Sequence, residues 1–316
     1  MASIMMLFIM LTFISPIVSL SSSSWIIYWA GMELGFLSVF PILYSFNSLL
    51  VTESSIKYFL VQSVASILMF FSGAKIFMMM EAHFFNVIVL LLSLLMKLGM
   101  FPFHFWVIPV ISNIGYMQIV FLLVFLKVAP LGLLNLVYTE FSLYSLTMIF
   151  SVLTVIMGAS LGNNCTNIRS LLASSSIVHS GWFFLGSMAG AMWFYFIVYS
   201  SILVISLIFI NTNMYLLSSL MILSLSGMPP FMLFLTKYYI LMLLVKLGYS
   251  LFILVIPLAS AAFSLNFYLK LGYSFYLNNQ NKQVNLVFLY TFFGLNAMTG
   301  LLLFTLFFYG RVQAMN

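Results

Sequence analysis

The sequence predicts an all-α protein that crosses a membrane many times, and three observations carry this prediction. Hydrophobic residues make up 65 % of the 316 residues and charged residues only 4 %, whereas a soluble domain carries about 25 % charged residues. The mean hydropathy is +1.23. The apolar runs are continuous over about 20 residues, the length of a membrane helix, and lack the polar–apolar alternation of barrel strands. Because lipid offers the backbone no hydrogen bonds, such runs must form helices.

Short polar or Gly-, Asn-, Ser- and Pro-containing stretches divide the chain into eleven candidate spans. In chain order they cover 3–20, 25–45, 54–73, 84–111, 116–137, 142–162, 167–188, 190–211, 215–246, 250–276 and 286–309. The first run has no basic segment before it, so we expect a membrane helix there rather than a cleaved signal. Since no linker interrupts the series, we expect a single transmembrane domain, 1–316, with approximate halves 1–140 and 141–276 and a C-terminal helix 286–309.

Two of these spans are too long for one ordinary crossing, and each carries a helix breaker near its centre. One contains KLGMFPFHFW (97–106) and the other LSLSGMPPFMLFLTK (223–237). Each combines a glycine and a proline with a lysine, Lys97 before the first break and Lys237 after the second. Interrupted helices at corresponding places in two halves indicate an internal repeat with a binding or transfer site at the breaks. A pair of proline kinks, which membrane helices tolerate, is the alternative.

Five ionisable residues fall inside the predicted spans. They are Glu33 in WAGMELGFL, Lys97, Lys127 in VFLKVAPLGLL, His179 in ASSSIVHSGWF and Lys237 in FLTKYYILM. A charge at mid-membrane costs about 2.5–3.5 kcal/mol, so each is a candidate functional residue. The alternatives are a structural salt bridge of Glu33 with one lysine, snorkelling of the lysines towards an aqueous edge, and helix packing by His179.

The number of buried lysines favours proton transfer over a purely structural role. One glutamate cannot neutralise three lysines, and desolvation disfavours the charged form of a buried amine, so such a lysine can take up and release a proton. Two charges about 8 Å apart interact by roughly 2 kcal/mol at an effective dielectric constant near 20. Moving one charge against 100 mV costs about 2.3 kcal/mol. A chain of lysines therefore has interaction energies of the right order for a proton relay.

Other kinds of site find no support in the sequence. The single cysteine, Cys165, excludes an internal disulfide and any multi-cysteine metal or iron–sulfur site. No glycine-rich nucleotide motif and no clustered histidine or cysteine ligands are present. The ten Lys and Arg residues are spread along the chain, so we expect no nucleic-acid partner. Glu53 and Lys57 have the i, i+4 spacing of an ordinary stabilising pair on a helix.

The distribution of basic residues near the span ends gives a prediction of orientation. With an odd number of spans, one side collects Lys57, Arg169, Lys270 and Lys282, and the other collects Lys75, Lys246 and Arg311. The excess lies on the side of the N-terminus. The positive-inside rule then predicts that the N-terminus faces the matrix or cytoplasm.

Several of these stretches resemble one known family in the order in which they occur. They are WAGMELGFLSVFPIL (29–43), ESSIKYFLVQSVASILMF (53–70), KLGMFPFHFW (97–106), FLKVAPL (125–131), IRSLLASSSIVHSGW (168–182), LSLSGMPPFMLFLTKYY (223–239) and NFYLKLGYS (266–274). Together they resemble the subunit 2 family of NADH dehydrogenase in mitochondrial respiratory complex I, which is a family of antiporter-like membrane subunits. The set covers most of the chain, and the family usually has arginine where this sequence has Lys270.

The resemblance implies a fold and a function. The family has two inverted five-helix repeats, each with a broken helix, and takes part in proton translocation. Its essential glutamate corresponds to Glu33, its broken-helix lysine to Lys97, its central lysine to Lys127 and its exit-side lysine to Lys237. The family's buried histidine corresponds to His179.

The resemblance also implies partners, cofactors and a location. NADH, FMN, iron–sulfur clusters and ubiquinone are expected to bind to other subunits of the complex, and no cofactor to this chain. The expected partners are adjacent antiporter-like and small membrane-arm subunits, and phospholipids including cardiolipin. The expected location is the mitochondrial inner membrane. Two alternatives remain at this point: an autonomous cation/proton antiporter, and a structural membrane subunit that does not pump.

Overall fold

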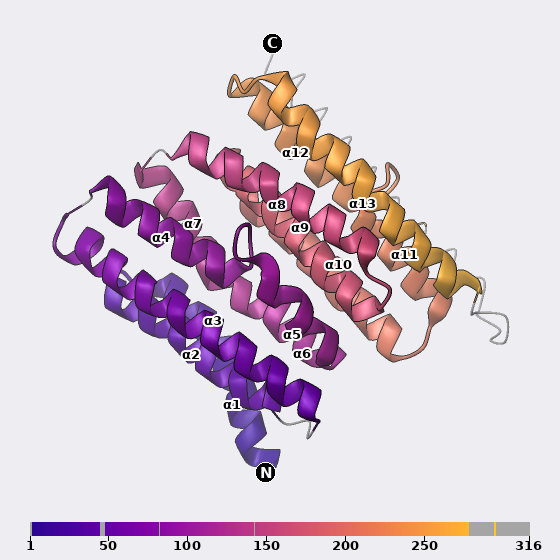
Figure 1. Ribbon diagram of the computed structural model, residues 1–316, viewed down its shortest axis with the longest axis horizontal. Coiled ribbons are helices and arrows are strands. Elements are labelled where there is room, and N and C mark those ends of the chain that lie inside the picture. The colour runs from indigo at the N-terminus through magenta and orange to yellow at the C-terminus, as the bar shows by residue number, and fades with distance from the viewer. Residues whose placement is uncertain (1, 45–47, 82, 142, 278–293, 295–316) are drawn as a thin grey trace. The chain divides into compact units, whose positions relative to one another are not determined.

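The computed structural model describes residues 2–44, 48–81, 83–141, 143–277 and 294, and confirms the predicted fold class (Figure 1). These residues form helices and connecting turns without a β-strand. Within this part of the chain, seven helices are long and apolar enough to cross a membrane, and two shorter apolar helices, Phe84–Leu98 and Tyr215–Ser226, begin the two interrupted spans. The count of eleven spans stays a prediction, since the last one, 286–309, lies outside the described residues.

The chain folds into two compact units, Met1–Leu161 with Cys165–Ser187, and Gly162–Asn164 with Met188–Asn316. The helices that begin in the first unit are α1 (Ala2–Ser21), α2 (Trp25–Tyr44), α3 (Leu49–Gly73), α4 (Phe84–Leu98), α5 (Val107–Asn113), α6 (Tyr116–Val120), α7 (Leu126–Phe141), α8 (Tyr144–Asn164) and α9 (Ile168–Met188). Those of the second are α10 (Met192–Asn211), α11 (Tyr215–Ser226), α12 (Met232–Lys246) and α13 (Leu251–Leu277). The single domain and its halves at about residue 140 stay a prediction.

Short non-α turns join some of these helices. A π-helical turn, η1 (Ala74–Met78), follows α3, and a 3₁₀ turn, η2 (His104–Trp106), precedes α5. A second π-helical turn, η3 (Phe121–Phe125), joins α6 to α7 within one continuous span. Neither π-helical turn was predicted from the sequence.

The third helix begins earlier than its predicted boundary at residue 54. Helix α3 starts at Leu49, and the side chain of Ser48 accepts a hydrogen bond from the Val51 backbone N–H, as N-cap residues do. The boundary was wrong because Leu49, Leu50 and Val51 were assigned to a loop together with the polar residues on either side of them. They lie instead on the first turns of the helix, where Lys57 forms an ion pair with Glu53.

Helices α1 and α2 of the first unit pack unusually close through small residues. Gly31 and Gly35 on α2 face Ser19 and Ser15 on α1, so each helix presents two small residues four positions apart. A Cβ atom added to Gly31 would lie 2.8 Å from the Ser19 backbone nitrogen. Membrane helices associate through such close contacts because lipid supplies no hydrophobic force between them. The contact fixes the helix that carries Glu33.

Replacing Gly31 with alanine is expected to destabilise the protein by about 1–3 kcal/mol, the usual cost of overpacking. The added Cβ would meet backbone rather than a flexible side-chain end, so α1 and α2 must move apart. The thermal denaturation midpoint of the purified protein measures the effect. Gly272→Ala on α13 is the matched control, because its nearest side-chain atom would lie 3.5 Å away. Equal midpoints for the two variants would contradict the close α1–α2 contact.

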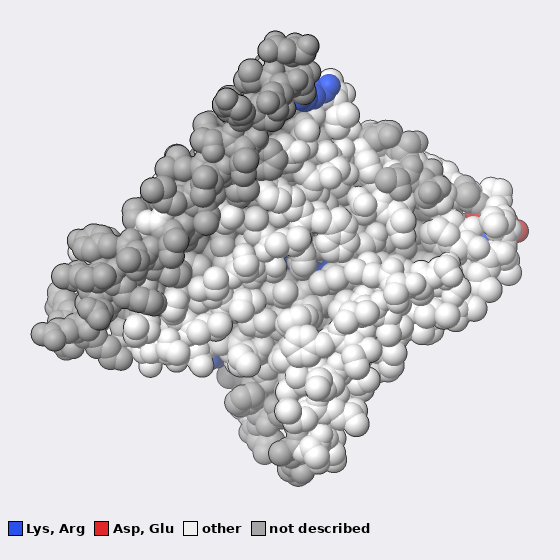
Figure 2. All heavy atoms as spheres, turned by 180° about the vertical axis from the view of Figure 1, so that it is seen from behind, with Lys and Arg blue, Asp and Glu red and all other residues white. Residues whose placement is uncertain are grey.

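The outer surface of the helices is apolar. In the first unit, α1 exposes large hydrophobic side chains along its length, among them Ile4, Leu7, Met10, Ile14 and Ile17. Figure 2 shows a face on which few charged atoms interrupt the uncharged surface. Lipid tails can cover such a surface, as the composition of the sequence predicts.

Candidate functional site

The first unit brings Glu33 and Lys97 together as a buried ion pair. Glu33 lies on α2, between the two glycines that contact α1, and Lys97 lies in the last turn of α4. The Lys97 Nζ donates to Glu33 Oε1 at 3.1 Å. Only 4 % of the Lys97 side chain and 16 % of the Glu33 side chain are exposed. The residues alone left three lysines open as the partner of Glu33, and the structure shows the pair with Lys97 that we expected once the family resemblance was considered.

Helix α4 ends at Leu98, one residue after Lys97. Side chains from other parts of the first unit form hydrogen bonds with the backbone carbonyls at this helix end. Gly99 adopts a left-handed conformation with φ of +68° and ends α4. The Trp106 indole N–H donates to the Met96 carbonyl at 3.1 Å, and the Gln62 side-chain amide donates to the Lys97 carbonyl at 3.4 Å. An interruption at membrane depth is tolerated when protein groups supply such hydrogen bonds.

Lys127 is buried in the same unit without a carboxylate partner among the described residues. It follows the π-helical turn η3, and such turns often occur at functional sites because they shift the side chains after them around the helix. Its Nζ donates to the Ser176 carbonyl of α9 at 3.3 Å. The same atom lies 5.8 Å from the centre of the Phe183 ring, within the range of a cation–π interaction.

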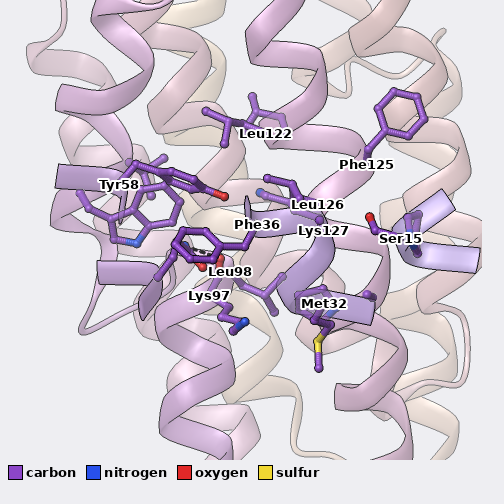
Figure 3. Close-up of a pocket in the computed structure, with 18 of the residues that line it drawn as sticks. Ser15, Met32, Phe36, Tyr58, Lys97, Leu98, Leu122, Phe125, Leu126 and Lys127 are labelled. Atoms are coloured by element: carbon purple, nitrogen blue, oxygen red, sulfur yellow. Dashed lines mark hydrogen bonds between the residues drawn. The ribbon is translucent and has the colours of Figure 1, made fainter. Parts of the chain in front are cut away.

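A small cavity joins the two lysines of the first unit (Figure 3). Its lining includes Lys97 and Lys127, together with the polar residues Tyr58, Gln62 and Ser15. Its volume is about 40 Å³, and about 10–15 Å³ of such space is enough for one water molecule when polar partners are present. The lysines therefore share a space that is large enough for water, whose mostly apolar wall is interrupted by these polar side chains.

His179 lies on the face of α9 that contacts Lys127. It is fully buried, three residues after Ser176 and four before Phe183, and residues at these spacings share one helix face. Nearby serines on α9 donate their hydroxyls to their own helix backbone, as Ser175 does to the Leu172 carbonyl and Ser180 to the Ile177 carbonyl. These hydroxyl oxygens keep lone pairs with which to accept hydrogen bonds.

The second unit contains the other interrupted helix and the remaining lysine. Helix α11 ends at Ser226, and Gly227 follows with φ of +77°. Lys237 on α12 is buried, and its Nζ donates to the Ser226 carbonyl at 3.1 Å. The carboxyl end of a helix carries a partial negative charge and stabilises a cation. The predicted break is confirmed, and its lysine reaches back to the carbonyl end of the half-helix that precedes the break.

Two polar residues of the cavity wall were missed in the sequence. Tyr58 and Gln62 lie four residues apart on α3 and both line the cavity. The available signal was Gln62, an amide side chain within an apolar helix, with an aromatic hydroxyl one turn before it. Tyr58 and Gln62 were not predicted as site residues because the candidates were chosen from the ionisable residues within the spans.

The comparisons with known proteins agree with this architecture. Residues 22–217 match the family model described as NADH:quinone oxidoreductase/Mrp antiporter, transmembrane. Among solved structures, a chain of respiratory complex I from Thermus thermophilus is similar with a TM-score of 0.76 and 21 % identity, over 85 % of this chain and 70 % of that chain. A chain of the Mrp complex from Dietzia sp. is similar with a TM-score of 0.76 and 14 % identity, over 84 % and 59 % respectively. Fold and family match together define an antiporter-like membrane protein.

Curated relatives narrow this class. NADH-ubiquinone oxidoreductase chain 2 of Albinaria caerulea is 35 % identical, over 92 % of this chain and 95 % of the relative. The protein of the same name from Anopheles gambiae is 34 % identical, over 87 % of each chain. The chain belongs to the NADH-ubiquinone oxidoreductase chain 2 family.

Proposed function

We propose that this protein is a membrane-arm subunit of NADH:ubiquinone oxidoreductase (complex I) that moves protons along a buried axis of Glu33, Lys97 and Lys127. The single observation that carries the proposal is the cavity between the two lysines, one of which is paired with Glu33. The relatives named NADH-ubiquinone oxidoreductase chain 2 support this proposal, since an enzyme of that name oxidises NADH and reduces ubiquinone.

The ion pair supplies the switch in this proposal. Two opposite charges about 4 Å apart attract by roughly 4 kcal/mol at an effective dielectric constant near 20. This is more than the roughly 2.3 kcal/mol needed to move one charge against 100 mV. When an adjacent subunit draws Glu33 away from Lys97, the Lys97 proton becomes easier to release into the cavity, where Lys127 can take it up. Following the family resemblance, His179 lies on the proton path and Lys237 acts on the exit side.

The surroundings proposed for the subunit follow from the family. It lies in the mitochondrial inner membrane with its N-terminus on the matrix side, next to other antiporter-like and small membrane-arm subunits and to phospholipids including cardiolipin. Electron transfer takes place in other subunits, which bind NADH, FMN, iron–sulfur clusters and ubiquinone. In this chain, proton transfer is carried by side chains and water alone.

An autonomous cation/proton antiporter is the second candidate, and the similarity of the fold to a chain of the Mrp complex favours it. The two functions differ in what the isolated chain can do. An antiporter reconstituted alone in liposomes would exchange cations for protons down a gradient, whereas a complex I subunit should be silent until it is assembled. The third reading, a structural subunit, predicts that neutral replacements impair assembly and leave coupling intact.

Lys97→Met in the assembled complex tests the proposed function. Because the variant has no amine to protonate at the break, the number of protons moved per electron pair is expected to fall while the chain still assembles. Proton uptake by proteoliposomes during NADH oxidation measures the number. Lys57→Met is the matched control, since Lys57 is an exposed lysine whose partner, Glu53, lies on the same helix. An unchanged proton number in the Lys97 variant would refute the role.

A further inference from the structure

Tyr58 is held in one orientation at the wall of the cavity. Its side chain is almost fully buried on α3. The ring lies between two other aromatic rings, with its centre 5.8 Å from that of Phe36 and 5.8 Å from that of Trp106. The Trp106 ring is itself fixed by its hydrogen bond to the Met96 carbonyl. These contacts direct the Tyr58 hydroxyl, and removing the hydroxyl would leave them in place.

The Tyr58 hydroxyl faces the space between the ion pair and Lys127. Figure 3 shows it pointing into the cavity, on the side where Lys127 lies. No hydrogen bond from this hydroxyl to another described residue is found, whereas the Tyr28 hydroxyl of the same unit donates to the Ala129 carbonyl at 2.7 Å. The two hydroxyls differ accordingly: Tyr28 joins α2 to α7, and Tyr58 is available to water.

Gln62 forms the next part of the same wall, one turn further along α3. Its amide nitrogen is engaged by the Lys97 carbonyl, so its amide group is anchored to the end of α4. One face of α3 therefore lines the cavity with Tyr58 and Gln62, and the same face holds the end of α4 that carries Lys97. A polar wall of this kind can order a water molecule between Lys97 and Lys127, because a buried water typically needs about three hydrogen-bond partners.

We propose that the Tyr58 hydroxyl is a proton-relay group between Lys97 and Lys127, acting through water in the cavity; this inference rests on the proposed function. The hydroxyl oxygen accepts a proton that originates from the Lys97 amine, and the proton already on the oxygen passes to the Lys127 amine. One O–H bond forms as the other breaks, so the phenol remains neutral throughout. Rotation about the C–O bond then restores the starting arrangement. Lys97 loses one positive charge and Lys127 gains one.

Tyr58→Phe tests the proposal, because it removes one oxygen atom and keeps the ring between Phe36 and Trp106. In the assembled complex, the rate of coupled NADH oxidation is expected to fall about tenfold, less than the effect of losing a full acid–base group because water still offers a slower path. The solvent deuterium isotope effect on turnover is expected to rise, since proton transfer becomes limiting. Tyr28→Phe is the matched control, and it should change neither quantity while costing a structural hydrogen bond.

The Lys97→Met variant, measured alongside, separates this inference from the proposed function. If Lys97→Met lowers the proton number and Tyr58→Phe changes neither rate nor isotope effect, the relay is overturned and the proposed function stands. If neither variant has an effect, the proposed function fails and the relay with it. Should Tyr58→Phe and Tyr28→Phe slow turnover equally, with the isotope effect unchanged, Tyr58 serves packing only and the relay is overturned.

Discussion

Glu33→Gln is expected to destabilise the protein by about 3–5 kcal/mol, the cost of leaving one member of a buried ion pair without its partner. The reason lies in the surroundings of Lys97, whose side chain is only 4 % exposed and whose ammonium group donates to Glu33. A glutamine at this position has nearly the same shape but cannot balance the charge. The thermal denaturation midpoint of the assembled complex measures the loss, and proton translocation should fall with it.

The double variant Glu33→Gln with Lys97→Met completes this test. Replacing both members of a buried ion pair with uncharged residues of similar volume is often neutral in stability. The double variant is therefore expected to denature at a higher temperature than Glu33→Gln alone, while remaining unable to pump. A Glu33→Gln variant as stable as the wild type would mean that the pair contributes little, and the switch assigned to it would be wrong.

Lys127→Met is expected to abolish proton transfer through this subunit without lowering its stability. Lys127 is held by the Ser176 carbonyl and the face of Phe183, and no carboxylate in the described part of the chain is left unpaired when its charge is removed. Methionine has a similar length and suits an apolar interior. Burying the amine of a lysine costs free energy, whereas burying the apolar side chain of methionine carries no such cost. We expect a denaturation midpoint equal to or above that of the wild type.

The measurement for Lys127→Met combines the denaturation midpoint with the proton number per electron pair in proteoliposomes. Lys246→Met is the control, because Lys246 lies exposed in the last turn of α12. Loss of pumping with retained stability would separate Lys127 from a structural role. A variant that pumps normally would remove Lys127 from the axis, and one that fails to assemble would favour the structural reading of the subunit.

Much of the fold follows from local features of the sequence. Continuous apolar runs set the helices, and both predicted breaks occur where glycine takes a left-handed conformation, at Gly99 and Gly227. The start of α3 was misplaced because the polar residues around it were taken as the sign of a loop, whereas the helix begins with Leu49 directly after the Ser48 cap. The π-helical turn before Lys127 has no comparable signal, since its residues are as apolar as their neighbours.

The charged residues of the candidate site were predicted from the sequence, whereas its neutral polar residues were not. Glu33, Lys97 and Lys127 stand out because a charge within an apolar span is costly. Tyr58 does not stand out, because tyrosine is common in this chain, with 17 copies. Its position between two aromatic rings depends on residues of α2 and of the segment after the break.

The sequence by itself determined that the protein lies in a membrane, where its helices and the two helix interruptions occur, and which ionisable residues are buried. Each of these features depends on residues that are neighbours along the chain. Only the tertiary structure showed the geometry of the Glu33–Lys97 pair, that Lys97 and Lys127 share one cavity, and that a tyrosine hydroxyl faces it. The physical reason is the range of the interactions. An ion pair, a cavity and a directed hydroxyl arise between helices, and no local pattern specifies how the faces of separate helices meet.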